Sequence, residues 1–459
     1  MRHELVSNQI SLANFFIFNP DYGQKEGKEA EKIFYYYPPD EKIEKQIRTA
    51  GFCAGMIKFT QTFKSSKPCE FVHTEKVRMI INELGDNFWM VIGINVPLSL
   101  DKVYENDLLS DQIYMSVLKK IYNYYQLFNG KIGDSLKLMG QDKLKEKMKL
   151  FFDDYIETKL NVRDYDIMNT FNGLQFMSLD RNMYLKIQSL LNLLEEKLPL
   201  VQRVVVMHSD QVIWSGLEQE DISAIYQYLK ELISKNATSV PQSQLASKFL
   251  VDENAKNLMS SLTNPSTSNN SENSIDQFDQ EYFEFKRVYL DKPDPEQFYL
   301  IPYNLSKMTF FVFIPTSQSF KLSLLKEIDE ILAPNLVLFI KEISEQQLKR
   351  SSIFTEEKEI KYIYFNRLNL AQKSTLNKTK DLPKHLMALI AQLSKDLESC
   401  VPSGEIFVKS GKDYWIACKK SDLREVYVVV CQKNANLTMI DEEVKQLCST
   451  DFSNIFFME

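Results

Sequence analysis

The chain has 459 residues, 44% hydrophobic and 12% aromatic, a length that suits about three domains with cores of their own. Its formal net charge of −7 provides no overall positive field for binding nucleic acid. It has only 13 glycines, no two of them within two residues of each other, and neither G-x-G-x-x-G nor G-x-x-x-x-G-K-[ST] occurs. The composition therefore excludes the common glycine-rich phosphate-binding loops.

Residues that bind metals or perform catalysis are sparse and scattered. The six cysteines include no C-x-x-C and the four histidines no H-E-x-x-H, so neither a zinc site nor a disulfide framework is expected. We interpret the cysteines as buried free thiols in a reducing compartment. Paired acids such as Asp153-Asp154 suit helix termini, and His208-Ser209-Asp210 suits a hairpin turn better than a catalytic triad. We expect no catalytic residue, no metal and no cofactor.

The N-terminus has no apolar segment followed by a cleavage site, and no stretch of 18 apolar residues occurs later. These patterns predict a chain that works in the cytoplasm.

The first block of the sequence alternates short strands with long helices. Strand-like runs lie at 15–18, 33–37, 71–81 and 88–95, and helical periodicity appears at 41–63 and 107–128. No convincing fifth strand is evident. Two further helices, at 136–155 and 184–197, lead into the next block.

The middle and C-terminal blocks repeat one order of elements, β-β-α-β-β-β-α. The middle block has strands at 203–208, 211–215, 283–290, 297–301 and 308–314, with helices at 220–233 and 320–345. The last block has strands at 360–365, 368–372, 405–409, 414–419 and 425–431, with helices at 384–398 and 441–448. Each of the three blocks also has a tryptophan in a strand, in NFWMV, QVIWSG and KDYWIAC.

This order predicts an α/β (α+β) protein with three longin-like domains, each a five-stranded antiparallel sheet flanked by helices. We expect the first domain at 12–160, a helical connector at 161–198, the second domain at 199–346 and the third at 357–459. A polar segment rich in serine and asparagine predicts a disordered loop at about 235–281, clearest at 264–280.

Two helices are candidates for binding surfaces. In 41–63, an apolar stripe runs beside two glycines four residues apart, where another backbone can approach closely. The stripe consists of Ile43, Ile47, Ala50, Ala54 and Ile57. The stripe fits packing on its own sheet and also fits a partner surface. The candidate contacts are Ile47, Gly51, Ala54, Gly55 and Lys58.

The second candidate is the helix within 137–155, where lysines surround an apolar face. Such a helix can lie on an anionic membrane, or its lysine stems can cover apolar surface of its own domain. The possible membrane-facing residues are Lys143, Lys145, Lys147 and Lys149.

Longer strings of the sequence resemble one known family. FFIFNPDYGQKEGKE, IKFTQTF and DNFWMV resemble its first domain, and YLKIQSLL with DQVIWSGLEQEDI its second. KYIYFNRLNLAQKST and KSGKDYWIACKKSDLREVYVVVCQKNANL resemble its third. The family is the Ccz family of vacuolar fusion proteins. The resemblance spans nearly the whole chain except about 235–281.

The resemblance implies that this chain pairs with a Mon subunit through the first longin domains. The pair acts as a guanine nucleotide exchange factor for a late-endosomal or vacuolar Rab GTPase, joined in animals by a third, regulatory subunit. It further implies peripheral contact with the endosomal membrane. The platform that grips the GTPase would fall within 12–128, where the helix with Gly51 and Gly55 is a candidate part of it. The alternative is a non-catalytic scaffold of a trafficking complex.

Overall fold

The computed structural model describes residues 10–63, 68–97, 109–162, 167–236, 248–250, 285–291, 294–319, 323–351, 361–376, 382–411, 414–432 and 435–451. These residues form three five-stranded antiparallel sheets. The chain divides into two compact units, Met1–Gly173 with Ile360–Leu368 and Lys373–Glu459, and Leu174–Glu359 with Asn369–Gln372. The first sheet and nearly all of the third belong to one unit, and the second sheet belongs to the other.

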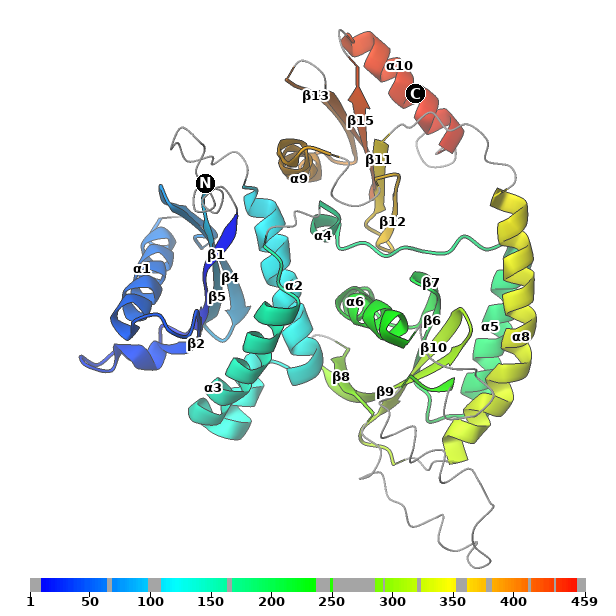
Figure 1. Cartoon of the computed structure of the whole chain (residues 1–459), viewed down its shortest axis with the longest axis horizontal. Coiled ribbons are helices and arrows are strands. Elements are labelled where there is room, and N and C mark those ends of the chain that lie inside the picture. Colours follow the sequence, from blue (N-terminus) through cyan, green and yellow to red (C-terminus); the bar gives the residue numbers. More distant parts are fainter. Residues whose placement is uncertain are drawn as a thin grey trace, which may run out of the picture. The chain divides into compact units, whose positions relative to one another are not determined.

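The first sheet has the strand order β2-β1-β5-β4-β3. Its strands are β1 (Ser11–Phe18), β2 (Ile33–Tyr37), β3 (Phe71–His73), β4 (Val77–Gly85) and β5 (Phe88–Asn95). The accompanying helices are η1 (Glu29–Lys32), α1 (Ile43–Gln61), α2 (Asp111–Asn129) and α3 (Ile132–Thr158). Helix α1 covers one face of the sheet, and α2 and α3 lie on the other (Figure 1).

The first sheet has five strands, as the longin-like plan predicted, although the sequence pattern alone did not reveal the fifth. The run at 71–81 is two strands, because Thr74 turns the chain between them. The Thr74 backbone N–H donates to the Val77 carbonyl at 3.0 Å, and the Val77 N–H donates to Thr74 Oγ1 at 3.0 Å. The turn contains neither glycine nor proline, so the sequence gives little sign of it.

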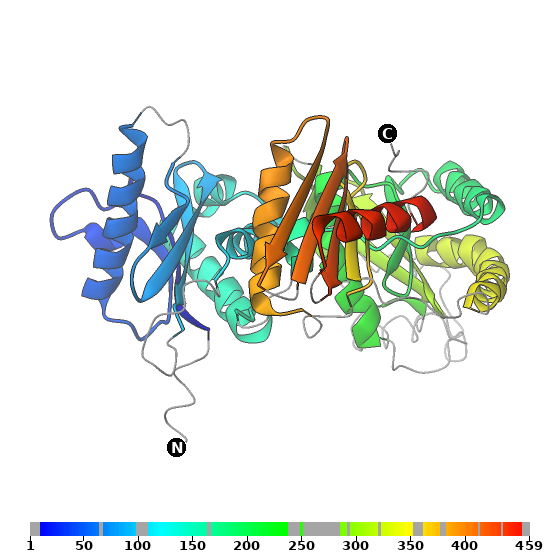
Figure 2. The same ribbon diagram turned by 90° about the horizontal axis from the view of Figure 1, so that it is seen from above.

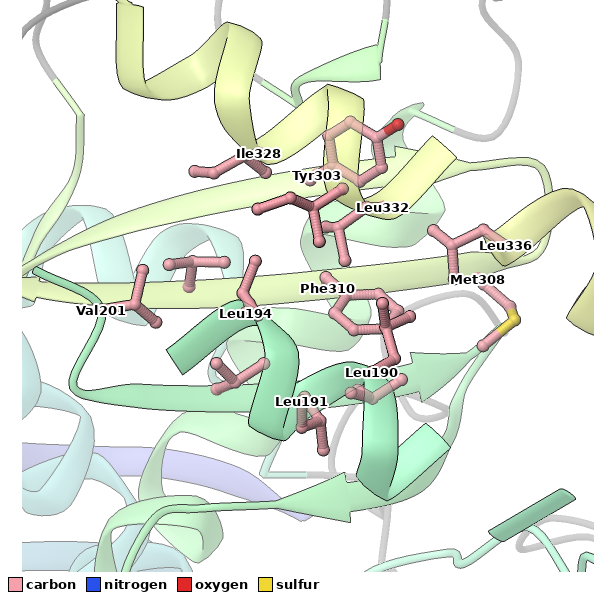
Figure 3. Packing of buried hydrophobic residues seen from close by; sticks show 14 of the residues in the cluster. Leu190, Leu191, Leu194, Val201, Tyr303, Met308, Phe310, Ile328, Leu332 and Leu336 are labelled. Carbon is pink, nitrogen blue, oxygen red and sulfur yellow. The ribbon is translucent and has the colours of Figure 1, made fainter. Parts of the chain in front are cut away.

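The second sheet repeats the order as β7-β6-β10-β9-β8. Its strands are β6 (Arg203–His208), β7 (Gln211–Ser215), β8 (Arg287–Leu290), β9 (Glu296–Leu305) and β10 (Met308–Pro315). The helices are α5 (Arg181–Lys197), α6 (Gln219–Asn236) and α8 (Ser323–Ser351). Leucines of α5 and α8 pack together on one face of the sheet around Phe310 and Tyr303 (Figure 3).

Three residues within the predicted loop at 235–281 are held in this second domain. Phe249 is fully buried and forms an antiparallel bridge with Tyr303 of β9. Lys248 Nζ lies 2.6 Å from the Asp329 carboxylate, which also accepts a hydrogen bond from the Tyr303 hydroxyl. The expectation of disorder therefore fails for Lys248, Phe249 and Leu250, because their apolar members fill the core. Residues 264–280 lie outside the described part of the chain.

The third sheet has the order β12-β11-β15-β14-β13. Its strands are β11 (Lys361–Asn366), β12 (Ala371–Ser374), β13 (Ser403–Ser410), β14 (Tyr414–Ser421) and β15 (Arg424–Cys431). The helices are α9 (Lys384–Glu398) and α10 (Leu437–Asp451), and the short α4 (Ile167–Phe171) contacts α9. Helix α10 lies across one face of the sheet (Figure 2) and completes an apolar cluster there.

A buried carboxylate lies inside the third domain. Glu425 is fully buried, and Arg367 donates to it through Nε at 2.6 Å and through Nη2 at 3.3 Å. The Tyr427 hydroxyl donates to the same carboxylate at 2.7 Å. Because a buried charge without a partner is costly, this pair constrains β11 and β15 to their observed register.

We expect Arg367→Met to destabilise the third domain by about 3 kcal/mol, because it leaves the Glu425 charge buried without its cationic partner. Urea unfolding followed by circular dichroism measures the change. The matched control is Lys186→Met, which breaks an ion pair with Glu342 that is exposed on both sides and should cost less than about 1 kcal/mol. Equal losses from the two variants would contradict the assigned role of Arg367.

Candidate partner interface

Helix α1 packs on its own sheet through one narrow side. Ala50, Cys53 and Ile57 are buried against an apolar cluster that includes Phe16 and Trp89. The predicted apolar stripe of α1 is therefore a surface that faces the core of its own domain.

The predicted stripe residues are not equally covered by the sheet. Ile47 and Ala54, two of the candidate partner contacts, are partly buried against the same cluster. Ile43 belongs to the predicted stripe but is 53% exposed at the start of the helix.

The two glycines lie beside this buried side rather than on it. A Cβ built on Gly51 or on Gly55 would meet no atom within 4 Å outside its own helix segment. The close approach that these glycines permit is therefore not used by the described part of this chain. Glycine in a helix interior costs roughly 0.5–1 kcal/mol relative to alanine, and no packing within the described residues explains that cost here.

The solvent side of α1 carries large aromatic side chains. Phe52 is 43% exposed and Phe59 is 58% exposed, and Lys58 is exposed beside Phe59. We define the α1 outer face as the following set of residues, which follow one another at helical spacing: Gly51, Phe52, Gly55, Lys58 and Phe59. It combines exposed apolar area with small residues, as surfaces that receive another chain do.

Phe63, just beyond the end of α1, extends the outer face. Its ring contacts the ring of Phe59 edge-to-face, with centroids 5.0 Å apart, and it is 56% exposed. The three phenylalanines fall outside the apolar stripe, so they were not among the predicted partner contacts. The signal was a second apolar spacing, at Phe52 and Phe59 on the same helix and at Phe63 just beyond its end.

The four lysines of α3 do not share one exposed face. Lys143 and Lys149 are exposed, whereas Lys145 and Lys147 are half-buried. Lys145 Nζ lies 5.3 Å from the centre of the Phe34 ring and donates to the Glu31 carbonyl at 3.4 Å. Burial lowers the pKa of both half-buried lysines.

The apolar side of α3 packs within the first domain. Leu144, Met148 and Phe152 are buried, and the Phe152 ring stacks on Tyr125 of α2 with centroids 5.2 Å apart. Two apolar residues point outward instead, Leu138 at 86% exposure and Leu150 at 78%. Because the helical backbone of α3 is broken at Gly140 (φ 78°, ψ 174°), Leu138 lies on the segment before the break, and Lys143, Lys149 and Leu150 lie on the segment after it.

The described part of the chain does not gather side chains that could bind a metal ion. Among the described residues, no cluster of three or more His, Cys, Asp or Glu side chains is arranged to hold a metal ion. His208 is buried at its hairpin, and desolvation lowers its pKa. Within the described part of the chain, no helix is both long and apolar enough to cross a membrane.

The cysteines are less uniformly buried than the sequence suggested. Cys53, Cys418 and Cys448 are buried, but Cys69 and Cys400 are partly accessible. Cys431 is exposed, because it is the last residue of β15. Burial raises the pKa of the Cys53 thiol to about 12, which keeps it protonated and unreactive.

Comparison with known proteins shows which family the domains of this chain match. Residues 12–130 match the family described as the first longin domain of INTU, CCZ1 and HPS4. Residues 201–333 match Intu longin-like domain 2, and residues 356–447 match Intu longin-like domain 3. The chain is also 35% identical to the vacuolar fusion protein CCZ1 homolog of Xenopus laevis, over 98% of each chain. The chain belongs to the CCZ1 family.

Other CCZ1 relatives match over the same extent. The homolog of Nematostella vectensis is 35% identical, and that of Dictyostelium discoideum is 29% identical, each over 98% of both chains. The matches confirm the Ccz resemblance and the three longin-like domains. The α1 outer face lies within the part that matches the first longin domain of the family.

Gly55→Ala should raise the stability of the first domain by roughly 0.5–1 kcal/mol, because the added methyl group meets open space and improves helix propensity. The control is Ala50→Leu on the same helix. The Ala50 methyl group is fully buried, so a larger side chain does not fit there and a loss of about 1–3 kcal/mol in the free energy of unfolding is expected. Thermal unfolding of the full chain measures both. A destabilising Gly55→Ala would show that this glycine already packs against the chain itself.

Proposed function

We propose that the chain is a subunit of a heterodimeric Mon–Ccz guanine nucleotide exchange factor. The complex would promote GDP release from, and GTP loading of, a late-endosomal or vacuolar Rab GTPase of the Rab-seven type. Through that GTPase it would drive endosome maturation and the fusion of vesicles with the lysosome or vacuole. The observation that carries this proposal is the α1 outer face, an uncovered apolar surface in the domain that matches the first longin domain of CCZ1.

The α1 outer face suits a protein partner better than solvent. Burying a phenylalanine side chain contributes about 1.5–3 kcal/mol, so Phe52 and Phe59 together can anchor an interface. Gly51 and Gly55 let a second backbone approach the helix between these rings. In the proposed complex that backbone belongs to the Mon subunit or to the GTPase.

An exchange factor makes and breaks no covalent bond. It binds the nucleotide-free GTPase more tightly than the loaded one, and this difference in affinity accelerates nucleotide release. The requirements on this chain are therefore a shaped surface and a second subunit. A catalytic residue, a metal or a cofactor is not part of the mechanism.

The second candidate function is a non-catalytic scaffold of a membrane-trafficking complex. Under this alternative the same α1 outer face holds the Mon subunit, and the exchange reaction takes place entirely on that subunit. The two candidates differ in what the partner does alone.

Gly55→Leu and Phe59→Asp should each reduce nucleotide release by the Mon–Ccz pair about tenfold or more, because both changes disrupt the centre of the interface. The assay follows a fluorescent guanine nucleotide leaving the Rab GTPase. The control is Leu437→Asp, which replaces an equally exposed leucine on α10 and should leave the rate unchanged.

The same assay separates the two functions. The proposal expects acceleration by the pair and little by either subunit alone. Full activity of the Mon subunit alone would assign this chain the scaffold role. Co-purification of the variants with the Mon subunit then tells whether α1 contacts that subunit or the GTPase.

We also propose that α3 takes part in peripheral contact with the endosomal membrane, to which the complex is recruited from the cytoplasm. Lys143 and Lys149 supply exposed charge, and Leu138 and Leu150 supply apolar side chains that can enter the headgroup region. A further regulatory subunit, where one exists, would bind elsewhere on the pair.

Lys143→Glu with Lys149→Glu should weaken flotation with anionic vesicles by about tenfold or more, since each lysine near such a surface contributes about 1 kcal/mol. The matched control is Lys326→Glu with Lys341→Glu, the same charge change on exposed positions of α8. Equal weakening by both pairs would mean that net charge, and not α3, governs the contact.

A further inference from the structure

Strand β13 forms the longest edge of the three sheets. It has eight residues, and it is paired on one side only, with β14, in a register without a shift from Ser403 to Ser410. The strands at the corresponding edge of the other two sheets, β3 and β8, have three and four residues. A long, regular edge strand offers a row of backbone donors and acceptors to another strand.

The hydrogen bonds to β14 fix which backbone groups of β13 point outward. The Asp422 N–H donates to the Pro402 carbonyl at 2.9 Å, so residues 402 and 422 form a hydrogen-bonded pair. Because such pairs alternate in an antiparallel ladder, the even-numbered residues of β13 bond to β14. The N–H and C=O groups that face the free edge belong to Ser403, Glu405, Phe407 and Lys409.

Within the described residues, these outward groups have no backbone partner beyond the sheet. Two edges of the second sheet differ from that of β13. The N–H of Met177 and the carbonyl of Gln175 both bond to Val212 at the edge of β7. The Leu250 N–H bonds to the Pro302 carbonyl, where β9 extends beyond β8. Other segments of the chain thus pair with parts of these edges, whereas no described segment pairs with the free edge of β13.

The sequence of β13 is complementary to itself when two copies run antiparallel about Phe407. Glu405 of each copy then lies opposite Lys409 of the other, and Phe407 lies opposite Phe407. On the other side of the sheet, Ile406 lies opposite Val408. All outward backbone groups of residues 405, 407 and 409 meet a partner in this register, because odd positions face odd positions.

We propose that two copies of this chain associate by antiparallel pairing of β13, which would join their third sheets into one continuous sheet. Opposite charges and apolar pairs directly across two strands are the contacts that stabilise such pairing. Glu405 is 44% exposed beside Lys419, and Lys409 lies over the Trp415 ring, so both side chains are already held at the edge. The outward N–H and C=O groups of β13 suit an extended strand as the binding partner. The order of Glu405 and Lys409 along β13 suits a second copy of the same strand.

Charge reversal tests the pairing without removing any backbone group. Glu405→Lys alone or Lys409→Glu alone places like charges opposite each other twice in the pair, which should weaken self-association about tenfold or more. The double variant Glu405→Lys with Lys409→Glu restores opposite charges and should recover it. Sedimentation velocity of the full chain, over a wide range of concentration, measures the association, and circular dichroism confirms that the variants fold.

Mixing the two single variants gives the decisive result. The Glu405→Lys chain presents two lysines and the Lys409→Glu chain two glutamates, so the two should associate with each other although neither does with itself. A wild-type chain that stays monomeric throughout, or a dimer that ignores these charges, would overturn the proposal. Loss of binding to a different protein in the single variants, with no self-association, would overturn it too and assign β13 to that protein.

Discussion

Helices packed on the sheets decide which surfaces of this chain remain available to other molecules. In the first domain α1 buries one face of the sheet, and α2 and α3 pack on the other, so the apolar residues of both faces are used internally. The third domain uses α10 in the same way. What is left for recognition is the outer side of the covering helices and the edges of the sheets. The α1 outer face and the free edge of β13 are one example of each.

The amphipathic division of α1 is the clearest link between local sequence and partner binding. A helix needs only a narrow apolar side to hold a sheet, and Ala50, Cys53 and Ile57 supply it. The exposed rings of Phe52 and Phe59 are therefore in excess of what packing on the sheet requires. Two glycines in the same segment lower the stability of the helix. We infer that a contact outside the described part of the chain offsets this loss.

Much of the fold could be predicted because periodicity is a local signal. The bounds of α9 follow from its regular leucines, and the hairpin of β6 and β7 follows from its turn. The tryptophans show the limit of such patterns. Trp89, Trp214 and Trp415 lie in the fifth, second and fourth strand of their sheets, so their recurrence does not mark equivalent positions.

The candidate site was harder to predict than the fold. Gly51 and Gly55 could be singled out, because glycine in a helix is a local anomaly. Which side of α1 stays open depends on how the helix sits on the sheet, and sequence spacing alone does not say this. Likewise, the outward groups of β13 follow from one hydrogen bond at Pro402, which no residue pattern indicates.

The buried ring of Phe249 has a consequence for how this chain can change in evolution. It ties the chain to β9 at one point between α6 and β8, so this connection is held at an internal position as well as at its two ends. The entropy of closing a loop grows slowly with length, by about 0.6 kcal/mol for each doubling. Insertions on either side of Phe249 should therefore cost little free energy of folding, and an insertion on one side should not affect the other. Neither insertion should shift the register of β8 and β9. Variation in length can accumulate there while the second core stays unchanged.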